Sequence, residues 1–150
     1  MRIRAAVWGA LVLTVLDAVA WAQEARVPVQ LPPAMREHML RNMRDHLRAL
    51  DQIIGDVSAQ RYIEASRLAE ERLGMSSLRA HDAEHLAQYF PKDMQLAGSA
   101  MHRAASRFAM AASDSDIDRS YQGLLKLTAR LAELTATCTA CHAAYRLAEP

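Results

Sequence analysis

Apolar residues recur every three or four positions in four separate stretches of this chain, which is the period of one face of an α-helix. The first stretch begins near Pro33 and ends at Gly55 and Asp56. Its apolar face consists of Leu40, Met43, Leu47, Leu50, Ile54 and Val57. The spacing therefore predicts a first helix over residues 33–56.

A second helix is predicted over residues 58–73. Ser58 is suited to the N-cap, and Gly74 is suited to ending the helix with a left-handed backbone. The face of this helix is less apolar and contains Tyr62, Ser66, Ala69 and Leu73. Residues 75–90 are expected to add a turn or two of helix before a connection at 88–90.

Two further helices complete the pattern. Pro91 suits the first turn of the third helix, and the polar run 113–116 is expected to end it and to supply an N-cap and acids to a fourth helix over residues 116–146. The third face contains Met94, Ala97, Met101, Ala104, Phe108 and Ala111, and the fourth contains Leu124, Leu127, Leu131, Leu134, Cys138, Cys141 and Tyr145. Four such helices with short connections predict an all-α, antiparallel four-helix bundle.

The first 22 residues have the composition of a secretory signal peptide. Basic residues at Arg2 and Arg4 precede an apolar stretch that ends in Ala20-Trp21-Ala22. The stretch contains Asp17 and is shorter than the ~20 clean apolar residues of a membrane span, so we expect cleavage rather than a stable anchor. Residues 23–150 are then an exported, periplasmic domain with a formal net charge of zero, which offers no general attraction for nucleic acid.

Residues 138–142 read Cys-Thr-Ala-Cys-His, which is the haem-attachment pattern Cys-x-x-Cys-His. On a helix, positions i, i+3 and i+4 share one face, so Cys138 and Cys141 can form thioethers with the two haem vinyl groups while His142 ligates the iron. A disulfide would close a very short loop, a thioredoxin-like motif needs a βαβ unit, and a zinc site needs a fourth ligand. We therefore predict one covalent haem c.

With the motif near its C-terminus, the chain resembles the class II cytochromes c, whose best-known members are the cytochromes c′. The resemblance includes Tyr145 and Arg146, because the family commonly continues Cys-x-x-Cys-His-x-x-Tyr/Phe-Arg/Lys. It implies that the haem lies near the end of the last helix of a four-helix bundle. It also implies that the first helix covers the opposite, distal face of the haem.

The resemblance places Arg36 and Glu37 beside the haem edge, with Arg36 near a propionate, and Leu40 over the distal face. It implies a five-coordinate iron that binds small diatomic gases such as nitric oxide or carbon monoxide. Met43 or Met39 next to Leu40 leaves open a six-coordinate His/Met haem in a plain electron carrier.

The sequence contains no set of residues typical of a catalytic centre, so we predict a redox and haem-binding protein rather than an enzyme. A peroxidase-type enzyme would need acid-base groups, for which His38 is the nearest candidate. His81 and His85 have a spacing that can bind a metal on a helix, but no further ligand is apparent. Expected partners are periplasmic electron donors and acceptors, and a homodimer is possible through Met39 and Ile53.

Overall fold

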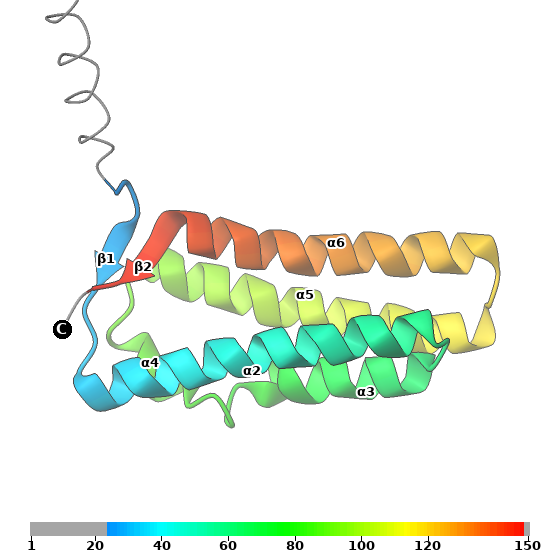
Figure 1. Ribbon diagram of the computed structural model, residues 1–150, viewed down its shortest axis with the longest axis horizontal. Coiled ribbons are helices and arrows are strands. Elements are labelled where there is room, and N and C mark those ends of the chain that lie inside the picture. The colour runs from blue at the N-terminus through cyan, green and yellow to red at the C-terminus, as the bar shows by residue number, and fades with distance from the viewer. Residues whose placement is uncertain (1–23, 149–150) are drawn as a thin grey trace, which may run out of the picture.

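The structure is a computed structural model that describes residues 24–148, and this part of the chain is mainly helical, as predicted (Figure 1). The predicted signal peptide lies outside the described residues. Among the described helices, none is long and apolar enough to cross a membrane. In chain order the elements are β1 (Val27–Val29), α2 (Pro33–Ser58), α3 (Tyr62–Arg72), the 3-10 helix η1 (Met75–Ser77), α4 (Ala83–Ala87), α5 (Lys92–Ile117), α6 (Tyr121–Ala144) and β2 (Tyr145–Leu147).

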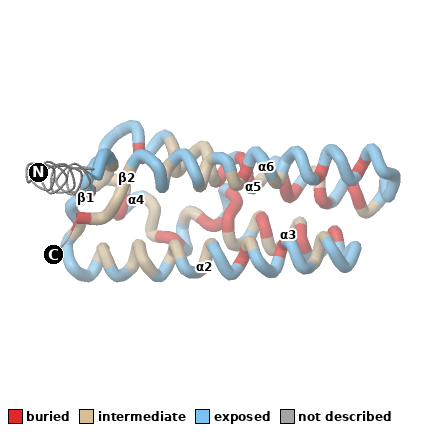
Figure 2. Tube along the Cα trace, turned by 45° about the horizontal axis from the view of Figure 1, so that its top comes forward, coloured by how far each residue is buried: buried red, intermediate tan, exposed pale blue. Residues whose placement is uncertain are grey.

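Four helices lie side by side along the long axis, with α2 against α3, α3 against α5, and α5 against α6. Buried residues gather along α3 and the facing parts of its neighbours (Figure 2). Many of them are alanines, which let the helix backbones approach closely, and Phe108 and Leu127 are among the largest side chains enclosed between them. Because α3 ends at Arg72, the other half of α2 has no helix of this kind beside it, and this is where the cavity described below lies.

The buried face of α2 differs from the predicted one. Leu47 and Ile54 are exposed, whereas Ala49 and Ile53 are completely buried. The stripe that contains Ile53 faces α3 because α3 is the main helical neighbour of α2. Ile53 is therefore not available on the surface for a homodimer, and Met39 lines an internal cavity instead.

The connection from α2 to α3 was predicted incorrectly. Ser58 is the last residue of α2 rather than an N-cap, and its hydroxyl donates a hydrogen bond to the Ile54 carbonyl within that helix. Gly74 follows α3 as expected, but its φ of −73° is not left-handed. A glycine is required there for another reason, since a Cβ would lie 2.8 Å from the Glu70 Cα atom.

The polar run 113–116 does not break the chain. It belongs to α5, where Ser115 is buried and donates its hydroxyl hydrogen bond to the Ala111 carbonyl. A serine whose hydroxyl is hydrogen-bonded to the preceding turn is tolerated inside a helix. The N-cap of α6 is Ser120, whose hydroxyl accepts a hydrogen bond from the Gly123 backbone N–H at 3.1 Å.

The last helix ends at Ala144, two residues before its predicted end. The chain then becomes extended, and β2 pairs in parallel with β1 so that Val27 lies opposite Tyr145 and Val29 opposite Leu147. Val29 is buried, and its carbonyl accepts a hydrogen bond from the Ala148 N–H. The segment before α2 is thereby attached to β2, which begins three residues after His142 (Figure 1).

Candidate functional site

A cavity of about 590 Å³ lies between α2, α5, the end of α6 and the segment that connects α3 to α5. Its volume is within the range of about 300–1,000 Å³ typical of small-molecule and cofactor sites. Most of its wall is apolar. The methionines and leucines that form it are Met39, Leu40, Met43, Leu47, Leu50, Leu73, Leu78, Leu86, Met94, Met101 and Leu134.

The residues of the Cys-x-x-Cys-His motif lie on the last two turns of α6, and all three line this cavity. Cys138 and Cys141 are half-buried free thiols, and burial raises the pKa of both. The Cys138 thiol points along its own helix toward the Leu134 carbonyl, at 3.6 Å. The structure therefore presents two unoxidised thiols and one imidazole, His142, at a single apolar wall.

Three residues predicted for the distal side line the same cavity from α2. These are Met39, Leu40 and Met43, all half-buried. Arg36 and Glu37 are not part of the wall. Glu37 is on the surface, where it forms an ion pair of 2.9 Å with Arg41.

Arg36 and Arg146 share an unusual property. The Nε atom of each is buried and has no hydrogen-bond partner, whereas buried polar atoms are nearly always paired. Arg36 lies in the first turns of α2, and Arg146 lies in β2, just beyond the motif. Both side chains can therefore still accept an anionic partner.

Three histidines that the sequence analysis did not assign to the site also line the cavity. They are His46 from α2, His81 from the segment before α4, and His102 from α5. His46 could have been suspected because it follows Met43 by three residues. His81 could not, because its position depends on the irregular chain between η1 and α4.

His81 and His85 do not form the predicted pair on one helix. Asp82 between them has a left-handed backbone, with φ of 52°, and α4 begins only after it. His81 is buried, while His85 is exposed, lies 3.6 Å from the Asp82 carboxylate and stacks on Tyr89. No group of three or more potential ligands within residues 24–148 is arranged to hold a metal ion.

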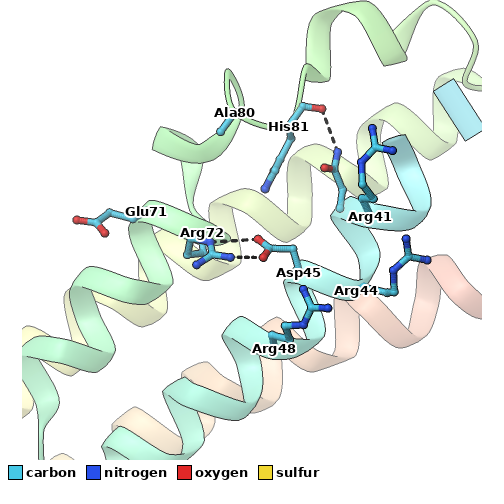
Figure 3. Close-up of a pocket in the computed structure, with 9 residues that line it drawn as sticks. Arg41, Arg44, Asp45, Arg48, Glu71, Arg72, Ala80 and His81 are labelled. Atoms are coloured by element: carbon cyan, nitrogen blue, oxygen red, sulfur yellow. Dashed lines mark hydrogen bonds and ion pairs between the residues drawn. The ribbon is translucent and has the colours of Figure 1, made fainter. Parts of the chain in front are cut away.

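A second hollow, of about 500 Å³, lies on the outer side of α2 and is mainly polar (Figure 3). Arg72 forms an ion pair with Asp45 there, which joins α3 to α2. Asn42 donates a hydrogen bond of 3.1 Å to the His81 carbonyl, and His38 bonds to the same oxygen at 3.0 Å. These contacts hold the His81 segment against α2 and so fix one wall of the cavity.

Comparisons with family models, with curated proteins and with solved structures found no match to this chain, so its function is inferred from the cavity and the residues around it.

Proposed function

We propose that this protein is a periplasmic class II c-type cytochrome in which one haem c is attached through Cys138 and Cys141 and its iron is ligated by His142. The observation that carries the proposal is that all three residues of the motif line one apolar cavity together with Leu40 and Met43 of α2. Attachment motif, cavity and expected distal residues therefore coincide.

The residues present suit this cofactor. Two free thiols three positions apart on one helical face match the two vinyl groups, and the imidazole that follows can reach the iron. The bound haem would supply reversible one-electron chemistry and a coordination position at its iron. The chain holds the porphyrin covalently and surrounds it with apolar side chains.

For the distal side we propose a vacant sixth position covered by Leu40, which is the arrangement that the resemblance to the class II cytochromes implies. Small neutral gases such as nitric oxide and carbon monoxide can enter an apolar pocket at low cost, whereas anions are disfavoured by desolvation. Electron exchange with periplasmic partners is compatible with the same site. In the alternative, the sulfur of Met43 or Met39 would ligate the iron and the protein would only carry electrons. This alternative stays open because both side chains also line the cavity.

A peroxidase-type activity receives no support from His38, the nearest acid-base candidate on the first helix. Its Nε2 atom is bonded to the His81 carbonyl, and the side chain is not part of the cavity wall. We therefore propose a redox and gas-binding role rather than catalysis. We also propose that α2, α3, α5 and α6 form the antiparallel four-helix bundle of the class, with the haem near the end of α6.

The first test is the mass of the mature protein after export in a host that matures c-type cytochromes. We expect the mass of one haem, which acid-acetone extraction does not remove. Cys138→Ala combined with Cys141→Ala should abolish the covalent increment. Thr139→Ser, a change within the same motif, should retain it. A wild-type protein without the increment would refute the proposal.

The second test separates the two distal states by absorption spectroscopy. A high-spin spectrum that shifts when carbon monoxide is added to the reduced protein is expected for the vacant site. Leu40→Ala should then accelerate carbon monoxide binding, because it removes the side chain that covers the iron. A low-spin spectrum that becomes high-spin in Met43→Ala or Met39→Ala would establish methionine ligation instead.

A further inference from the structure

Three imidazole rings meet at the wall of the cavity. The ring centroids of His46 and His81 are 4.6 Å apart, those of His81 and His102 are 5.5 Å apart, and those of His46 and His102 are 6.2 Å apart. His81 and His102 are buried, and His46 is half-buried. We call these three residues the histidine cluster.

The hydrogen-bond partners define where protons lie in the cluster. The His102 Nδ1 atom is 2.8 Å from the Leu73 carbonyl, which can only accept, so this nitrogen carries its proton. The Ser77 hydroxyl donates to the Gly74 carbonyl at 2.7 Å, so its oxygen accepts from His81 Nδ1 at 3.3 Å. When they are neutral, the His81 and His102 rings therefore each have an unprotonated Nε2 atom.

The unprotonated Nε2 atom of His81 faces the His46 imidazole. The Nε2 atoms of His46 and His81 are 3.4 Å apart, so His46 donates to His81 when both are neutral. An added proton can then enter at the remaining nitrogen of His46, and the resulting imidazolium still donates to His81. The mutual repulsion of charges at such distances disfavours a second proton in the cluster.

The charges around the cluster are limited. The Asp45 carboxylate acts on both His46 and His81 but is paired with Arg72. The His38 ring bonds to the His81 carbonyl. Glu70 of α3 faces His102 but is bound by the hydroxyls of Ser76 and Ser106. Burial, followed by repulsion within the cluster, lowers the pKa of His46 to about 4 and also lowers that of His81.

We propose that His46, His81 and His102 form a single-proton site whose occupancy is coupled to the oxidation state of the haem, an inference that rests on the function proposed above. When an external one-electron donor reduces the ferric iron to ferrous, the site loses one positive charge. The cluster, which lines the same cavity, then takes up one proton from solvent. Because the uptake accompanies reduction, acid raises the midpoint potential.

The direct test is the midpoint potential of the haem-loaded protein, measured by spectroelectrochemistry from pH 4 to pH 8. We expect the potential to fall as the pH rises through the acidic part of this range and to become constant near neutral pH. His46→Gln and His81→Gln should each flatten the acidic slope. His85→Gln is the matched control, since His85 lies outside the cavity and should leave the slope unchanged. A haem-loaded wild type with a constant potential, or a slope that survives in both cluster variants, would overturn the proposal.

A second measurement on the wild type does not depend on the haem. Deuterium exchange at the imidazole Cε1 position, followed by mass spectrometry, reports the titration of each histidine. We expect the pKa of His46 to be about 4 and that of His81 to lie below the usual value of a histidine. Ordinary titration of both would show that the cluster is not the proton site, whereas a missing haem mass with depressed titration would refute the proposed function and its coupling but leave the cluster itself intact.

Discussion

Gly74 shows how closely a single residue can be constrained without an unusual backbone angle. A Cβ atom at this position would clash with a carboxylate oxygen of Glu70 and would lie 2.8 Å from the Glu70 Cα atom. That carboxylate is not free to move, because it accepts hydrogen bonds from the Ser76 N–H and from the hydroxyls of Ser76 and Ser106. The close approach also sets the start of the segment that carries His81.

Gly74→Ala should therefore lower the free energy of unfolding by about 2 kcal/mol, the usual size of an overpacking effect. Gly55→Ala is the matched control. Nothing lies within 4 Å of its added methyl group and the residue is inside α2, so alanine should stabilise by about 0.5–1 kcal/mol. Urea denaturation of both variants gives the comparison. Equal effects of the two changes would show that the contact with Glu70 is not rigid.

At the scale of the helices, apolar spacing predicted the existence and approximate bounds of α2, α3, α5 and α6. It could not choose between two adjacent apolar stripes on α2, because that choice depends on where α3 packs. The predicted face contained Ile54 and left Ile53 on the exposed side, yet Ile53 is the one that is enclosed. The ends of the helices were harder to predict, since the polar residues 113–116 are compatible both with a helix cap and with a helix interior.

The two neighbouring isoleucines provide a direct test of the observed packing. Ile53→Ala should reduce the free energy of unfolding by about 3–4 kcal/mol, because it leaves a cavity in the core. Ile54→Ala should cost less than about 1 kcal/mol, since the residue is already 46% exposed. Thermal and denaturant unfolding would measure both values. The reverse order would mean that α2 is rotated.

The paired strands allow a similar comparison on alternate faces of β1. Val29 is buried and Val27 is 48% exposed. Val29→Ala should therefore lower the free energy of local opening of the β1–β2 pair by roughly 1–2 kcal/mol, and Val27→Ala should lower it much less. Amide hydrogen exchange at Tyr145–Leu147 is the appropriate measurement, because loss of so short a pair is local unfolding. Unchanged exchange in Val29→Ala would contradict the pairing.

For the molecule as a whole, the three residues of the Cys-x-x-Cys-His motif and the residues Met39, Leu40 and Met43, which were expected on the distal side of a haem, line one cavity. The sequence did not predict the histidine cluster, because three residues far apart in sequence reach one place only through the packing of α2 and α5 and the irregular chain between α3 and α4. Arg36 and Glu37 were predicted by resemblance alone, and neither lines the cavity.

The cluster also makes the stability of the whole fold depend on pH. An unfolded histidine titrates near pH 6.5, whereas burial lowers the pKa of folded His46 to about 4. Between these values the unfolded chain binds more protons, so this contribution to stability is complete above pH 6.5 and is lost as the pH falls to about 4. The expected loss is about 3 kcal/mol.

Urea unfolding at pH 7 and at pH 4 measures this loss. His46→Gln should remove most of the part that belongs to the cluster, while the exposed His85→Gln should lose as much stability on acidification as the wild type. A His46→Gln protein that is as acid-sensitive as the wild type would assign the effect to carboxylates instead.

The pairing of β1 with β2 has a consequence for the order of assembly. Its two strands lie far apart in the chain, because β1 precedes the four long helices and β2 follows the last of them. Contacts between such distant segments carry the largest loop-closure cost and form late. If haem is attached as proposed, late pairing of β1 with β2 would leave the turn that bears Cys138 and Cys141 accessible to the attachment machinery during folding.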